Sequence, residues 1–168
     1  VPLYFSAVLD RKPESYGSFH GNTQLADAKE SKGTGAGMYF TFSNEQQEAV
    51  TAKIGLSYTS VENARINLQA EAEGKTFEDA KEQAHQIWQE YLGRIEVETS
   101  KREDKVKFYT GLYHALLGRG LANDVNGAYP RNDGSVGQLP MKEGKPQYNV
   151  YNTDAAWGAQ WNLSQLWT

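Results

Sequence analysis

The spacing of apolar residues changes once along the chain, near Thr59, and this change limits what the chain can fold into. Before it, five apolar residues alternate with polar or small ones: Val50, Ala52, Ile54, Leu56 and Tyr58. Such period-2 alternation is typical of a half-buried β-strand. After Thr59, apolar residues recur every three or four positions, as they do on one face of an α-helix. The sequence therefore predicts an α+β chain with a boundary near residue 59.

Residues 1–58 are predicted to form antiparallel β-structure. Residues 2–9 have the apolar composition of a buried strand, and residues 37–42 alternate Met38, Phe40 and Phe42 with Tyr39 and Thr41. Residues 22–35 are polar and rich in glycine, which predicts a loop. Several short strands joined by turns favour a β-sandwich or part of one.

Residues 59–117 are predicted to contain three helices, because three segments begin with a capping-box pattern. The segments start at Thr59, Thr76 and Ser100, each followed three residues later by Glu or Asp. Gly93 and Gly118 are the expected ends of the second and third helices. Residues 119–150 carry Gly, Pro, Asn and Asp throughout, which predicts a long loop, and a last helix is expected near Thr153 or Asp154.

The charge and composition exclude several classes of protein. A net charge of −4 and a pI near 5.4 argue against a nucleic-acid surface, which needs a basic stripe. No run of basic residues is present to hold an anionic membrane, and no apolar stretch is long enough to span a bilayer. The absence of Cys excludes disulfides and thiolate metal sites. Because the apolar pattern of residues 166–168 has no closing signal, we expect the chain to be part of a larger protein.

Residues 151–168 have the composition of a sugar-binding surface. Three Trp and one Tyr lie among amide and carboxylate side chains, and a pyranose offers C–H faces to aromatic rings and hydroxyls to polar groups. We predict substrate contacts from Asn152, Asp154 and Trp157. The structural alternatives are that Asp154 is a helix N-cap and that Trp157 and Trp161, four residues apart, pack against another helix.

Metal and catalytic motifs are weaker. Residues 123–127, Asn-Asp-Val-Asn-Gly, resemble an oxygen-ligand calcium loop, but the late Glu of an EF-hand is missing and Asn-Gly is also an ordinary turn. His20, His85 and His114 lack paired metal-ligand spacing, and the last two are expected to be surface or packing residues. The nucleophile elbow, the P-loop and the dinucleotide fingerprint are all absent.

Residues 107–117, Lys-Phe-Tyr-Thr-Gly-Leu-Tyr-His-Ala-Leu-Leu, resemble the first barrel helix of glycoside hydrolase family 92, the bacterial exo-acting α-mannosidases. The following residues 123–129, Asn-Asp-Val-Asn-Gly-Ala-Tyr, are similar to its Ser-Asp-Val-Asp-Gly-x-Tyr loop. Residues 53–65 look like the last sandwich strand and the start of the linker, and residues 88–96 look like the second linker helix. The resemblance covers most of residues 50–168, in order.

This resemblance implies an architecture and an activity. Residues 1–58 would be part of an N-terminal β-sandwich, residues 59–99 a helical linker and residues 100–168 the start of an (α/α)₆ catalytic barrel. The complete enzyme would be periplasmic or extracellular and would hydrolyse terminal α-mannosides, here assigned as α-1,2-linked, with inversion and with calcium as cofactor. Its partners would be a mannose-containing glycan and the rest of its own barrel. The catalytic acid, the base and the calcium ligands are expected beyond Thr168, so the isolated chain is expected to be inactive.

The chain departs from the family pattern in the predicted site. Many members read Phe-Ser-x-Trp-Asp-Thr-x-Arg where residues 151–158 read Tyr-Asn-Thr-Asp-Ala-Ala-Trp-Gly. Asp154 is therefore one position earlier than the usual Asp, and Gly158 replaces the Arg. Two other interpretations fit the same residues: a non-catalytic carbohydrate-binding module that uses the aromatic surface, or an interaction domain whose Trp side chains form its core.

Overall fold

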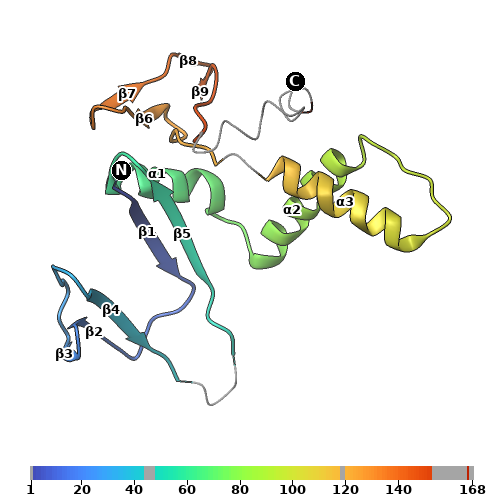
Figure 1. Ribbon diagram of the computed structural model, residues 1–168. Coiled ribbons are helices and arrows are strands. Elements are labelled where there is room, and N and C mark those ends of the chain that lie inside the picture. Colours follow the sequence, from blue (N-terminus) through green and yellow to red (C-terminus); the bar gives the residue numbers. More distant parts are fainter. Residues whose placement is uncertain (1, 44–47, 118–119, 153–165, 167–168) are drawn as a thin grey trace. The chain divides into compact units, whose positions relative to one another are not determined.

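The structure, a computed structural model, describes residues 2–43, 48–117, 120–152 and 166 (Figure 1). It is a mixed α+β chain with antiparallel sheets and three helices, which confirms the predicted fold class. The chain divides into two units, residues 7–53 and residues 1–6 together with 54–168. In the part of the chain that the structure describes, no helix is both long and apolar enough to cross a membrane.

The unit of residues 7–53 contains a three-stranded antiparallel sheet. Its strands are β2 (Ser15–His20), β3 (Thr23–Ala26) and β4 (Ala36–Thr41), with β2 in the centre. Gly21 has a φ of 55°, which suits the two-residue turn that joins β2 to β3. The prediction of a loop over residues 22–35 was therefore wrong for β3, because a strand of four residues is too short to show a period.

Aromatic rings lie over glycines on neighbouring strands of this sheet. Gly17 is opposite Tyr39, and a side chain added at Gly17 would meet the Tyr39 hydroxyl at 2.6 Å. Gly37 is opposite Phe19 and would collide with its ring in the same way. Each glycine thus leaves the space that the aromatic ring fills, which explains glycine inside a strand.

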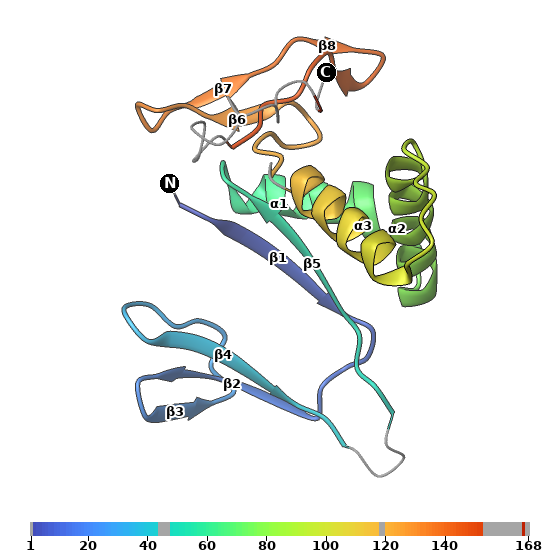
Figure 2. The same ribbon diagram turned by 45° about the vertical axis from the view of Figure 1, so that its right-hand side comes forward.

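Helix α1 (Val61–Ala72) packs closely on strand β5 (Ala52–Ser57), which pairs with β1 (Tyr4–Leu9) (Figure 2). A Cβ at Gly55 would lie 2.7 Å from the Cβ of Leu68 and even closer to the carbonyl oxygen of Ala64. Ala64 and Leu68 are buried. The small residue in β5 therefore sets the close approach of helix and strand.

Two of the three predicted helix N-caps, Thr59 and Ser100, were wrong. Helix α1 is capped by Ser60, not Thr59, and the Ser60 hydroxyl accepts a hydrogen bond from the Asn63 N–H. Helix α3 (Arg102–Leu116) starts after Lys101 without a side-chain cap, so the Ser100 prediction was wrong. Both helices have their N-cap one residue later than predicted, because neighbouring residues can occupy this position and tertiary packing decides between them.

The capping box at Thr76 is confirmed. Helix α2 (Phe77–Leu92) begins with reciprocal hydrogen bonds between Thr76 and Asp79 and ends at Gly93, as expected. Helices α2 and α3 lie side by side in both views, and the rings of Trp88 and Tyr113 are 4.6 Å apart (Figures 1 and 2). Gly118, the expected end of α3, lies outside the described residues.

Residues 119–150 were predicted to form one long loop, but the structure has four short strands within residues 120–152. These are β6 (Ala128–Pro130), β7 (Val136–Gln138), β8 (Met141–Lys142) and β9 (Lys145–Pro146), paired as two hairpins. Strands of two or three residues leave no period in the sequence, so only their turns were visible. The helix expected near Thr153 or Asp154 lies outside the described residues.

Candidate functional site

A buried carboxylate, Asp124, lies where the end of β5, helix α1 and the segment before β6 meet. Asp124 is 3% exposed. One of its oxygens accepts hydrogen bonds from the hydroxyls of Ser57, at 3.0 Å, and Thr59. The other accepts from the side-chain amide of Asn67, at 2.7 Å. Donors from β5, from the residues that follow it and from α1 therefore satisfy a carboxyl group that would be costly to bury without partners.

Asn67 of helix α1 completes this polar cluster. Its amide nitrogen also donates to the carbonyl of Leu56 at 2.8 Å, and its oxygen accepts from the N–H of Val125 at 3.0 Å. One turn earlier on the same helix, Asn63 accepts a hydrogen bond from Asn126 at 2.9 Å. Asn63 and Asn67 thus hold the segment of Asp124 against β5 and α1.

Residues 123–127 do not fit a calcium site. Both oxygens of the Asp124 carboxylate are used by protein donors, and the oxygen of the Asn126 side chain accepts from the N–H of Ala128 at 3.1 Å. The Gly127 N–H donates to the Asp124 carbonyl at 2.8 Å, and Gly127 has a φ of 82°, as an ordinary turn requires. Among the residues that the structure describes, no group of three His, Cys, Asp or Glu could hold a metal ion.

The side chain of Asn123 links this cluster to the predicted sugar-binding segment. Asn123 is 7% exposed. Its oxygen accepts from the N–H of Val150 at 2.7 Å, and its nitrogen donates to the Asn149 side-chain oxygen at 3.4 Å. The backbones of residues 120–122 and 150–152 are also paired. The Ala122 N–H donates to the Val150 carbonyl at 2.8 Å, the Asn152 N–H donates to the Gly120 carbonyl at 2.9 Å, and Leu121 and Tyr151 form an antiparallel bridge.

Of the three predicted substrate contacts, the structure places only Asn152. It is exposed, as is the preceding residue, Tyr151, at 49%. Asp154, Trp157 and Trp161 lie outside the described residues, so their roles stay predictions.

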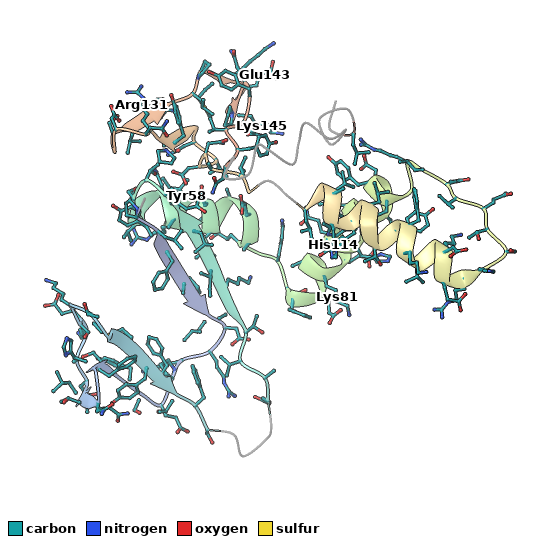
Figure 3. The ribbon with its side chains drawn as sticks, in the orientation of Figure 1. Tyr58, Lys81, His114, Arg131, Glu143 and Lys145 are labelled. Carbon is teal, nitrogen blue, oxygen red and sulfur yellow. The ribbon has the colours of Figure 1, made fainter. Side chains whose placement is uncertain are left out.

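A cavity of ≈ 300 Å³ lies beside the polar cluster. Residues 54–58 of and after β5, Asn67 and Glu71 of α1, and residues 121–124 line it. Figure 3 shows Tyr58 directly after the end of β5. Residues 121–124 thus line the cavity, and Asn123 among them bonds residues 149 and 150.

The sequence interpretation missed four residues of this cluster: Ser57, Thr59, Asn63 and Asn67. Asn67 left a signal, since it is a polar residue on the same helix face as Ala64 and Leu68, which are buried.

The histidines of the two long helices are exposed, as expected. His114 lies in a second, open depression of ≈ 560 Å³ along α3, lined by side chains of that one helix (Figure 3). His85 lies on α2 beside a depression that it shares with α3. Neither His85 nor His114 lines the cavity beside Asp124. We therefore assign neither of them an acid–base role in hydrolysis.

Family models match both parts of the chain. Residues 1–57 match the glycosyl hydrolase family 92 N-terminal domain, and residues 63–168 match the family 92 catalytic domain. No curated protein matches the chain.

Solved structures of the same family share this fold. The family 92 glycosyl hydrolase CcMan5 is 26% identical with a TM-score of 0.79, over 92% of this chain and 20% of that one. An inverting family 92 mannosidase from Bacteroides thetaiotaomicron VPI-5482 is 25% identical with a TM-score of 0.78, over 94% of this chain and 21% of that one. A family 92 α-mannosidase from Bacteroides thetaiotaomicron, at 22% identity and a TM-score of 0.69 over 89% of this chain and 20% of that one, shares the fold.

The chain spans about a fifth of the length of these solved relatives, 20% and 21%. It nevertheless matches the two domain models in their order along the sequence, and the catalytic-domain match alone extends over residues 63–168. The chain belongs to glycosyl hydrolase family 92.

Proposed function

We propose that the chain is part of a glycosidase that hydrolyses terminal α-mannosides, α-1,2-linked, with inversion at the anomeric carbon. The observation that carries this proposal is the ordered match of one short chain to both domains of a single hydrolase family. Two of the similar solved structures are mannosidases, and one of them is described as inverting.

In this proposal the chain supplies substrate binding. The backbone pairing of residues 120–122 with 150–152 leaves Tyr151 and Asn152 exposed at one edge. An aromatic ring can stack on the C–H face of a sugar, and an amide can both donate to and accept from its hydroxyls. We assign Asn152, Asp154 and Trp157 to sugar contacts. The mannose-containing glycan is the partner that this chemistry recognises.

The reacting groups are proposed to come from the remainder of the enzyme. Inversion requires one carboxylic acid and one carboxylate base about 6.5–9.5 Å apart, with a water molecule between the base and the sugar. Asp124 does not fit either role, because both its oxygens are engaged by buried protein donors. We therefore propose that the isolated chain is inactive and that residues 1–58, 59–99 and 100–168 are sandwich, linker and barrel parts of the whole enzyme.

Calcium and cellular location belong to the same proposal. A calcium ion, when bound, would hold sugar hydroxyls and help to distort the ring. Because the described residues offer no carboxylate cluster for it, its ligands are proposed to lie in the rest of the enzyme. A periplasmic or extracellular location is proposed from the resemblance to the bacterial exo-acting α-mannosidases.

The test uses the complete enzyme. We expect release of mannose from α-1,2-mannobiose, slower release from the α-1,3 and α-1,6 isomers, and β-mannose as the first product in proton NMR. Chelation should abolish the activity and calcium should restore it. Retention of the anomeric configuration, or activity that survives chelation, would contradict the corresponding part of the proposal.

A non-catalytic carbohydrate-binding module is the second candidate, favoured by the exposure of Tyr151 and Asn152. The two functions differ in what the isolated chain does. A module would be retarded by mannan in affinity electrophoresis, and the complete protein would leave every mannobiose intact. Cleavage of a mannobiose by the complete protein favours the enzyme, whether or not the isolated chain is retarded.

A further inference from the structure

We propose that Asn123 is a positioning residue of the glycosidase. It holds residues 149–152 in place, and these residues are called the sugar-binding edge. This inference rests on the proposed function, because it assigns a role within the same site. Asn123 is not proposed to touch the substrate: its side chain is buried and each of its polar atoms is bonded to protein.

The first step of the argument is that Asn123 has a fixed base. Its neighbour Asp124 is held by Ser57 and Asn67 through hydrogen bonds of 3.0 and 2.7 Å. Val125, two residues after Asn123, donates from its backbone to the same Asn67 at 3.0 Å. The backbone after Asn123 is therefore anchored to a strand and a helix that precede it by more than fifty residues.

The second step is that Asn123 transmits this anchoring to the sugar-binding edge. Its side-chain oxygen accepts the Val150 N–H at 2.7 Å, and its nitrogen contacts the Asn149 oxygen at 3.4 Å. Asn152 follows Val150 by two residues and donates from its own backbone to Gly120 at 2.9 Å. In the part of the chain that the structure describes, the Asn123 side chain thus joins the polar cluster to residues 149–152.

The third step concerns magnitude. Misplacement of a binding group by about 1 Å can lower activity by up to about a hundredfold. Loss of the Asn123 side chain leaves the backbone bonds of residues 120–122 in place, so the edge should loosen and not detach. Weaker ground-state binding raises KM with little change in kcat. We therefore expect Asn123→Ala to raise KM at least about fivefold.

The matched control is Asn63→Ala. Asn63 belongs to the same polar cluster and bonds Asn126, at 2.9 Å, and Thr59, at 2.7 Å, but not residues 149–152. Each variant removes one side-chain amide from the polar cluster around Asp124. They should lower the melting temperature of the complete enzyme by similar amounts, whereas only Asn123→Ala should raise KM.

Hydrogen–deuterium exchange of the complete enzyme gives a readout that is independent of activity. Asn123→Ala should speed exchange in the peptide that contains Val150 and Asn152, and Asn63→Ala should not. The inference is overturned if the two variants have the same KM and the same exchange in this peptide. Should Asn123→Ala not fold, Asn123→Leu, which has a similar branched shape but no acceptor for the Val150 N–H, takes its place with the same readouts.

Failure of the proposed function would be seen separately. Kinetics are measured on aryl mannoside, glucoside and galactoside. A wild-type enzyme that cleaves another glycoside contradicts the mannoside proposal, while its KM on that glycoside still tests Asn123. If the wild type cleaves none of them, the glycosidase proposal fails, and unchanged exchange in the Val150 peptide of Asn123→Ala would overturn the positioning role as well.

Discussion

The side-chain amide of Asn67 donates to the Asp124 carboxylate at 2.7 Å, although 57 positions separate the two residues in the sequence. Both side chains are buried, at 8% and 3% exposure. The bond joins helix α1 to the segment that precedes β6, and Asn67 also bonds the strand β5 on which α1 packs. One amide therefore connects three elements of the unit that contains the candidate site.

Asn67→Ala should be strongly destabilising. The change leaves one Asp124 oxygen, the Leu56 carbonyl and the Val125 N–H without this partner, and each unsatisfied buried group costs about 1–3 kcal/mol. We expect a loss of about 3–5 kcal/mol, since water can reach part of the site. Urea unfolding measures it, with Gln69→Ala, on the exposed side of α1, as control. A loss below about 1 kcal/mol would contradict the anchoring role of Asn67.

The capping box of α2 gives a second prediction. Thr76→Ala removes the hydroxyl that accepts the Asp79 N–H at 3.1 Å, so it should cost about 1 kcal/mol. Ser100→Ala should change stability by less than about 0.5 kcal/mol, because α3 has no side-chain cap. Thermal unfolding of the two variants side by side checks both. Equal losses would show that Ser100 caps α3 in solution.

The strands and helices with a regular period could be predicted, and the others could not. The alternation over residues 50–58 identified β5, and the capping-box patterns together with the change to helical spacing after Thr59 identified the three helices. Strands β3 and β6–β9 have two to four residues, so they contain no repeat to detect. Their hairpins are specified by turn glycines and by pairing partners, which local sequence does not identify.

The candidate site was predicted only in part for a related reason. Asn152 and the loop of residues 123–127 were recognised as chemically interesting, but the partners of that loop come from residues 57–67. A carboxylate that binds a cation and a carboxylate that binds buried hydroxyls have the same local sequence. Only the tertiary contacts show that Asp124 is a structural anchor.

Replacing Gly55 of β5 and Gly111 of α3 by Ala should change the free energy of unfolding in opposite directions. Gly55→Ala places a Cβ against Leu68 and the Ala64 carbonyl, and overpacking of this kind costs about 1–3 kcal/mol. Gly111→Ala lies within α3 with no other atom within 4 Å of the added Cβ. It should stabilise by about 0.5–1 kcal/mol, because Ala favours helix more than Gly does. Chemical denaturation distinguishes the two, and destabilisation by Gly111→Ala would show that this face of α3 is covered in the assayed protein.

Asp10 should make stability depend on pH. The Thr51 side chain and the Thr51 N–H, which donates to the Asp10 carboxylate at 3.0 Å, together hold the pKa of Asp10 below its usual value of 3.8. A lowered folded-state pKa adds stability that is present above pH 3.8 and is lost as the pH falls through the folded pKa. Asp10→Asn should therefore be less stable than the wild type at neutral pH.

The difference between wild type and Asp10→Asn should disappear in acid. Thermal unfolding at pH 7 and about pH 2.5 measures it. Glu98→Gln, at another exposed carboxylate, serves as control and should follow the wild type at both values. A difference between wild type and Asp10→Asn that persists unchanged at the lower pH would show that the hydrogen bond does not depend on the charge.

The last prediction concerns Asp154, assigned above to the sugar. In a water-poor site, a hydrogen bond to a charged carboxylate contributes about 1.5–3 kcal/mol. Asn has the same shape and caps a helix about as well as Asp. Asp154→Asn in the complete enzyme should therefore leave the melting temperature nearly unchanged and lower kcat/KM at least about tenfold, equivalent to about 1.4 kcal/mol. Full activity in the variant, or a joint loss of stability and activity, would identify Asp154 as a structural residue.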